Sequence, residues 1–137
     1  LSKTLRYTTN AMMLKQGEII TGEQCRIISY IAHRTSHGEC VYQRDLEDDF
    51  GVKRSSVASI LGNLEKSGYI ARSVCEEDAR IKRITLTEKG LRTSKQMYDN
   101  ICRLEQYLSN GMTPHEREEF IRLMKLAIEN LEKFKEE

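Results

Sequence analysis

The chain contains no tryptophan and only one proline, and aromatic residues make up 7% of its 137 residues. With charged residues at 31%, this composition is typical of a helix-rich, soluble protein, and the length suffices for one domain with a real hydrophobic core. No apolar run approaches the roughly 18 residues of a membrane span, and no signal peptide is recognisable. We therefore expect a cytoplasmic protein that does not enter a membrane.

The sequence also lacks the common signatures of catalysis and of structural metal sites. It has no glycine-rich phosphate loop, no nucleophile elbow and no obvious pair of catalytic acids, so we predict neither enzymatic activity nor a cofactor. The four cysteines, Cys25, Cys40, Cys75 and Cys102, form no CxxC pair. Neither a disulfide framework nor a zinc knuckle is indicated.

Charge is distributed unevenly along the chain. The formal net charge is only +1, but residues 53–95 hold ten basic and five acidic side chains, a net charge of +5. Within this part, the segment EEDARIKRITLTEKG, residues 76–90, begins with three acids and places Arg80, Lys82 and Arg83 after them. A basic region of this kind favours a polyanionic partner, which the near-neutral total would hide.

Hydrophobic periodicity and turn residues predict a chain of helices with a few short extended segments. The helices are expected over 1–15, from Thr21 or Gly22 to Ser36, over 45–50 and 53–67, from Thr87 to Asn110, and from Thr113 through Phe134. The extended segments are expected over 40–42, 69–74 and 81–86. The last helix is expected to bury Phe120, Leu123, Met124, Ala127, Leu131 and Phe134.

The middle of this order is that of a winged helix-turn-helix. Two short helices are separated by the turn Gly51-Val52-Lys53 and are followed at once by a two-stranded ribbon. In the second helix, an apolar stripe is formed by Val57, Ile60, Leu61 and Leu64. Small hydroxyls, an arginine and an asparagine lie mostly off that stripe, and such side chains fit a DNA major groove and bond to base edges.

The ribbon carries positive charge on a protruding hairpin. Arg80, Lys82 and Arg83 would let it lie along phosphates or enter a minor groove. Asp78, two residues before Arg80, is placed to hydrogen-bond the turn and to steer that arginine. The alternative is a solvated strand edge whose charges prevent aggregation.

Residues 41–90, VYQRDLEDDFGVKRSSVASILGNLEKSGYIARSVCEEDARIKRITLTEKG, resemble the core of the multiple-antibiotic-resistance regulator (MarR) family. The marks are Asp45-Leu46, Arg54-Ser55-Ser56-Val57, Leu64-Glu65-Lys66-Ser67-Gly68-Tyr69-Ile70, Asp78-Ala79-Arg80 and Leu86-Thr87-Glu88-Lys89-Gly90. The last two, at this separation, are highly specific. Because Thr21-Gly22-Glu23-Gln24 resembles the start of the family's second helix, the resemblance covers nearly the whole chain.

The resemblance implies a homodimeric transcription factor, usually a repressor, that binds a palindromic operator in double-stranded DNA. It implies a fold that is mainly α with a small β-hairpin (α+β). The winged helix-turn-helix DNA-binding domain would span 21–90, flanked by dimerisation helices in 1–20 and 91–137. Only about twenty residues precede the second helix, fewer than the family carries, and the sequence does not begin with Met. The first helix is therefore expected to be short or incompletely represented.

The same resemblance assigns roles in DNA binding. Arg80 would reach the minor groove and Asp78 would order the hairpin. The major-groove contacts would come from Arg54, Ser55, Ser56, Ser59 and Asn63. Lys53 and Lys82 suit phosphates, while Arg72 would brace the hairpin or contact the DNA backbone. A two-fold dimer should hold its recognition helices about 34 Å apart, one turn of DNA.

The signal that releases DNA stays open between several interpretations. A phenolic or other small amphipathic effector would contact Tyr7, Met12, Met13, Ile28, His33 and Tyr42, although an ordinary packed core predicts the same residues. Thiol oxidation would act at Cys25, near a helix N-terminus that would lower its pKa, or at Cys75 on the hairpin; inert cysteines are the alternative. No metal site is expected at His33 and His37, because residues 36–38 end the helix there.

A function of another class is also compatible with the pattern. A winged helix can serve protein assembly alone, without binding DNA. Such a module has no reason to keep Arg80 basic and exposed, so this side chain discriminates between the two functions.

Overall fold

The computed structural model describes residues 8, 11, 20–75, 78 and 80–136. The chain divides into two compact units, Leu1–Ile101 and Cys102–Glu137. Of the helix expected over 1–15, only residues 8 and 11 are described, and both are helical. Tyr7, Met12 and Met13 lie outside the described residues.

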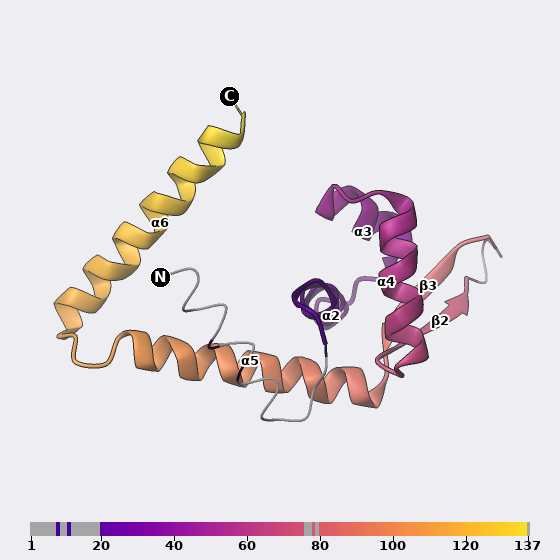
Figure 1. Cartoon of the computed structure of the whole chain (residues 1–137), viewed down its shortest axis with the longest axis horizontal. Helices are drawn as coiled ribbons and strands as arrows, with labels where there is room; N and C mark the ends of the chain where they lie inside the picture. The colour runs from indigo at the N-terminus through magenta and orange to yellow at the C-terminus, as the bar shows by residue number, and fades with distance from the viewer. Residues whose placement is uncertain (1–7, 9–10, 12–19, 76–77, 79, 137) are drawn as a thin grey trace. The chain divides into compact units, whose positions relative to one another are not determined.

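The first unit follows the predicted order of elements (Figure 1). Its elements are α2 (Gly22–Ser36), β1 (Val41–Tyr42), α3 (Gln43–Phe50), α4 (Arg54–Lys66), β2 (Ile70–Val74), β3 (Lys82–Leu86) and α5 (Glu88–Leu108), whose last turns continue into the second unit. The strands form an antiparallel sheet in the order β1-β3-β2, with Val41 paired with Ile84 and Arg72 paired with the same residue from the other side. The predicted fold class, mainly α with a small β-hairpin, is confirmed.

Local signals set the start of α2. The hydroxyl of Thr21 accepts the N–H of Gln24 at 3.2 Å, and the Gln24 side chain accepts the N–H of Thr21 at 2.8 Å. This reciprocal capping box satisfies two N–H groups that the helix itself cannot bond. It fixes the predicted start of the helix, whose buried face is formed by Ile27, Ile28 and Ile31.

The short helix α3 begins two residues earlier than expected. Asp45 was expected to open it, but its carboxylate accepts the N–H of Tyr42 at 2.8 Å, so Asp45 lies in the first turn and Tyr42 is the cap residue. The helix ends as expected at Gly51, whose φ of 58° is the left-handed conformation that glycine adopts most easily. The turn into α4 is therefore determined by this glycine.

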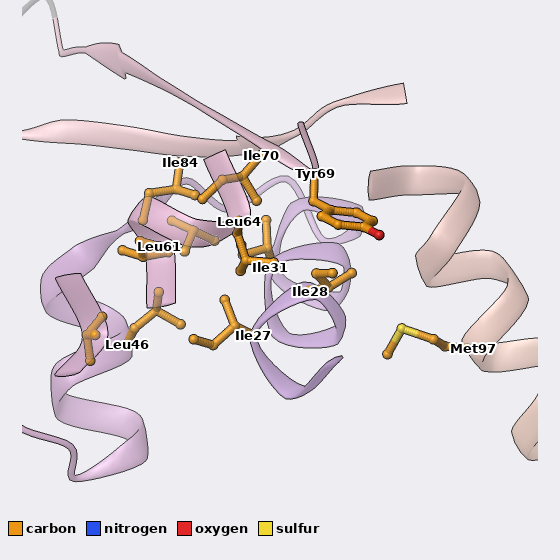
Figure 2. Close-up of a cluster of buried hydrophobic side chains, with 12 residues drawn as sticks. Ile27, Ile28, Ile31, Leu46, Leu61, Leu64, Tyr69, Ile70, Ile84 and Met97 are labelled. Atoms are coloured by element: carbon orange, nitrogen blue, oxygen red, sulfur yellow. The ribbon is translucent and has the colours of Figure 1, made fainter. Parts of the chain in front are cut away.

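One hydrophobic core positions α4. Val57, Leu61 and Leu64 are buried as expected, whereas Ile60 is half-buried. Figure 2 shows Leu61 and Leu64 among side chains from α2, from α3 (Leu46) and from the sheet (Ile70 and Ile84). Burial of one α4 face by three neighbouring elements leaves the opposite face, with its polar residues, outward.

The segment before α5 is bonded to the turn that ends α4. The Thr87 hydroxyl donates to the Gly68 carbonyl at 2.6 Å and accepts the N–H of Gly90 at 3.1 Å, as expected of an N-cap. The Lys89 ammonium donates to the Ser67 carbonyl at 2.9 Å and lies 4.1 Å from the centre of the Tyr69 ring. This small network explains the Thr and the Lys of the Thr-Glu-Lys-Gly sequence: the side chains of Thr87 and Lys89 join the start of α5 to the end of α4.

The second unit contains the end of α5 and α6 (Pro114–Glu136). Thr113 and Glu116 form the expected capping box, with the Thr113 N–H donating to the Glu116 carboxylate at 2.8 Å and the Glu116 N–H donating to the Thr113 hydroxyl at 3.3 Å. Within this single chain the apolar stripe of α6 is not buried as expected: Leu131 is 63% exposed and Phe134 75%. That a second copy covers it, as the dimerisation role expected for 91–137 implies, stays a prediction. An amphipathic pattern predicts a covered face, but it does not say which molecule covers it.

None of the described helices combines the length and the apolar character that crossing a membrane requires.

Candidate nucleic-acid interface

The outward face of α4 carries the side chains that were expected to contact DNA bases. Arg54, Ser55, Ser56, Ser59 and Asn63 are all exposed, and so is Lys53 just before the helix. The positive end of the α4 dipole, at the start of the helix, lies beside Lys53 and Arg54. No side chain forms a capping hydrogen bond there. The face is polar, cationic at one end, and free of bulky apolar groups.

The hairpin is ordered by the hydrogen bond expected of Asp78. Its carboxylate accepts the N–H of Arg80 at 2.9 Å, and its carbonyl accepts the N–H of Ile81 at 3.0 Å. Cys75 and Ile81 close the base of the turn with a backbone bond of 3.0 Å. Arg80 and Lys82 are both exposed. The turn therefore holds the Arg80 backbone in one conformation while its guanidinium faces solvent.

Arg72 differs from the other cations of this region because it is held within the protein. Its Nε donates to Oε2 of Glu65 at 2.9 Å, and its Nη2 bonds to the same oxygen. The hydrogen bond from Arg72 holds the pKa of Glu65 below its usual range. Both side chains are half-buried between β2 and the last turn of α4.

A groove of about 800 Å³ joins the start of α4 to the hairpin. Its walls come from α3, α4 and the sheet, and among the described residues its cationic lining is Arg44, Arg54, Arg72, Arg80 and Lys82. Acids also line it: Asp45, Glu47, Asp48 and Asp78. The groove thus unites five of the ten expected DNA contacts, Arg54, Arg72, Asp78, Arg80 and Lys82, whereas the remaining five are not part of its lining.

Several groove residues were not among the predicted site residues, Gln43 and Arg44 among them. Gln43 and Arg44 line the groove from the first turn of α3. They were overlooked because that helix was expected to begin at Asp45. The dipeptide Gln-Arg directly after the extended Val41-Tyr42 could have indicated polar groups at a helix start.

The expected effector residues do not share one site in the part of the chain that is described. Ile28 is fully buried in the core. His33 lies exposed on α2, with its ring 4.5 Å from that of His37. Tyr42 lies in the groove beside the hairpin, and a hydrogen bond with the Cys40 thiol raises the pKa of its hydroxyl. The effector assignment therefore stays a prediction.

The cysteines and histidines show no prepared ligand set. Cys25 on α2 and Cys75 after β2 are half-buried, as are Cys40 and Cys102. Over the described residues, no three His, Cys, Asp or Glu side chains come close enough together to hold a metal ion. Whether Cys25 or Cys75 responds to oxidation stays a prediction.

The order α3, tight turn, α4 and β2–β3 hairpin, packed on α2, defines this chain as a winged helix-turn-helix protein. A sequence model of the MarR family matches residues 20–81, which include the turn, α4 and the hairpin as far as Ile81. Over these residues the chain is similar to the MarR family.

Solved structures with the same fold cover almost the whole chain. A protein from Clostridium acetobutylicum assigned to the MarR family of transcriptional regulators is 25% identical, with a TM-score of 0.72 over 94% of this chain and 91% of its own. The S. aureus MepR–DNA complex gives 24% identity and a TM-score of 0.75 over 95% and 93%. S. aureus MepR bound to ethidium bromide is 22% identical, with a TM-score of 0.73 over 95% of this chain and 90% of its own. At these identities, the MepR comparisons establish the fold.

Proposed function

We propose that this chain is a transcriptional regulator that binds duplex DNA, with α4 in a major groove and the β2–β3 hairpin in the adjoining minor groove. The observation that carries the proposal is the groove that brings Arg54 of α4 together with Arg80 and Lys82 of the hairpin. Small hydroxyls on α4 are suited to base edges, and the exposed cations are suited to phosphates. S. aureus MepR, which shares the fold, has been solved as a DNA complex.

The proposal includes a homodimer acting as a repressor on a palindromic operator. Its support is the exposed apolar stripe of the second unit, a surface that a lone soluble chain rarely presents. The exposed large apolar residues of α6, within the stripe and beside it, are Ile121, Leu123, Met124, Leu126, Ile128, Leu131 and Phe134. A second copy would cover them, and a two-fold dimer reads an inverted repeat.

Release by a small amphipathic effector is the finer part of the proposal. It is supported by the fold shared with MepR, which was solved bound to ethidium bromide. Thiol oxidation at Cys25 or Cys75 is kept as the alternative signal. A titration of the protein–DNA complex with phenolic ligands, and separately with peroxide, distinguishes the two.

DNA binding is tested by fluorescence anisotropy on duplexes selected from a random pool. We expect tight binding to the selected duplex and a linear fall of log K with log salt, with a slope of about −0.9 for each phosphate contact. With about six such contacts, affinity should fall roughly 10³-fold between 50 and 200 mM salt. If selection enriches no sequence, and binding stays at the level of an unrelated duplex, the regulator proposal fails and an assembly module is favoured.

The dimer is tested by the Leu131→Glu variant. Because Leu131 is 63% exposed in the chain, the charge should leave the fold intact while it weakens a dimer built on this stripe. We expect an increase of at least about 30-fold in the dimer dissociation constant, measured by sedimentation, and weaker binding to the selected duplex. The control is Lys133→Gln, which changes the net charge equally. Unchanged sedimentation of Leu131→Glu would place the dimer interface elsewhere.

A further inference from the structure

The contact between Arg72 and Glu65 links the two elements that are proposed to enter DNA. Glu65 belongs to the last turn of α4, and Arg72 is the central residue of β2. Two nitrogens of the guanidinium bond to one carboxylate oxygen, an arrangement that fixes both the position and the orientation of the planar group. The ion pair thus spans the turn that separates the recognition helix from the hairpin.

The register of the sheet shows that Arg72 points toward the body of the protein. Arg72 pairs directly with Ile84, which is fully buried, and residues paired across antiparallel strands project from the same face. Figure 2 shows Ile84 on the side of the sheet where Leu61 and Leu64 of α4 pack. The Arg72 side chain is only 24% exposed, while that of Glu65 is 39% exposed. Arg72 is therefore directed at α4 and not away from it.

We propose that Arg72 is a positioning residue, whose ion pair with Glu65 sets the angle between the hairpin and the recognition helix. This inference rests on the proposed function. The strand continues for two residues beyond Arg72, about 7 Å at roughly 3.3 Å for each residue, so a small rotation at its base displaces Arg80 in the turn. When that angle is fixed in the free protein, the hairpin loses less conformational entropy on binding DNA.

The opposing assignment is that Arg72 contacts a phosphate directly and Glu65 only competes for it. Neutralising Glu65 separates the two assignments, because each predicts a change of DNA affinity in the opposite direction. If Arg72 is a DNA contact, Glu65→Gln frees the guanidinium and removes a negative charge near the phosphates, so binding becomes tighter. If the pair is a brace, Glu65→Gln weakens the brace and binding becomes weaker.

The experiment measures binding of the full chain to its selected duplex and to an unrelated duplex of equal length, at several salt concentrations. We expect Glu65→Gln and Arg72→Gln each to weaken binding to the selected duplex by about 5- to 30-fold, the effect of losing one hydrogen bond between charged groups. We expect the double variant to be no weaker than either single variant, since both remove the same interaction. The salt slope should stay within error of the wild type.

Two further variants separate bracing from charge and from misfolding. Arg72→Lys keeps the charge but loses the planar two-nitrogen contact, so we expect it to weaken binding like Arg72→Gln. Glu88→Gln removes an exposed acid that is paired with Arg92 on α5 and should not weaken binding. Hydrogen exchange of the hairpin amides should accelerate in the Glu65 and Arg72 variants while the core of α2 stays protected.

The remaining outcomes contradict either the brace or the proposed function. Tighter DNA binding by Glu65→Gln would assign Arg72 to a phosphate and overturn the brace. The same conclusion would follow if Arg72→Gln reduced the salt slope by about one while Arg72→Lys bound DNA like the wild type. Wild-type binding by every variant also overturns it. If the wild type itself does not distinguish the two duplexes, the proposed function fails first, and the brace falls with it.

Discussion

The Arg80→Ala variant is expected to bind the selected duplex roughly 5- to 150-fold more weakly, a loss of about 1–3 kcal/mol. Arg80 is exposed, lies on the groove lining, and has its backbone fixed by the Asp78 carboxylate at 2.9 Å. An arginine whose backbone is held this way would reach a narrow minor groove with less further ordering, so its removal should delete a partly prepared contact. Anisotropy titrations at constant salt measure the change.

The matched control for Arg80→Ala is Arg92→Ala. Arg92 is also an exposed arginine, but it lies on α5 and pairs with Glu88 one turn away. Both variants lose one positive charge, so a general electrostatic effect would weaken binding equally. We expect the loss to be much larger at Arg80. Equal affinities for Arg80→Ala and wild type would remove the hairpin from the DNA interface and favour the assembly module.

The recognition helix and the hairpin could be predicted because their signals are local. The apolar stripe of α4 is complete within one helix, and Gly51 and Gly68 adopt the positive φ angles, 58° and 78°, that mark the turns on either side of it. The Asp78 hydrogen bond spans two residues. Such features depend on neighbours in the sequence, so the sequence contains nearly all the information needed to predict them.

Features that depend on distant partners could not be predicted in the same way. Nothing near Val41 indicates that it pairs with Ile84, which follows after two helices and a strand. For Arg72, bracing of the hairpin and contact with the DNA backbone both stayed open, because the sequence does not show that the turn at Gly68 places Arg72 beside Glu65. The stripe of α6 was correctly recognised as apolar, but its periodicity contains no information on whether the same chain or another molecule covers it.

The Gly90→Ala variant is expected to lose about 2–4 kcal/mol of unfolding free energy, although alanine is the better helix former. A Cβ at this position would collide with the carbonyl oxygen of Tyr69, and it would lie 3.1 Å from that carbonyl's carbon and 3.2 Å from Cδ2 of Leu86. Relief requires α5 to move away from the turn after α4. That movement would stretch the bonds of Thr87 to Gly68 and of Lys89 to Ser67.

Gly62→Ala provides a control with the same chemical change and the opposite expected sign. Gly62 lies within α4, and a Cβ there would meet no atom within 4 Å, so alanine should stabilise the protein by about 0.5–1 kcal/mol through helix propensity alone. Urea unfolding measures the stability of both variants. We expect the urea concentration at the unfolding midpoint to fall for Gly90→Ala and to rise for Gly62→Ala, with the m-value unchanged. Since a domain is stable by only about 5–15 kcal/mol, the Gly90 loss is a large share of the total. Equal midpoints for the two variants would mean that α5 tolerates displacement from Tyr69, and that the Thr87–Gly90 segment does not fix how α5 joins the recognition helix.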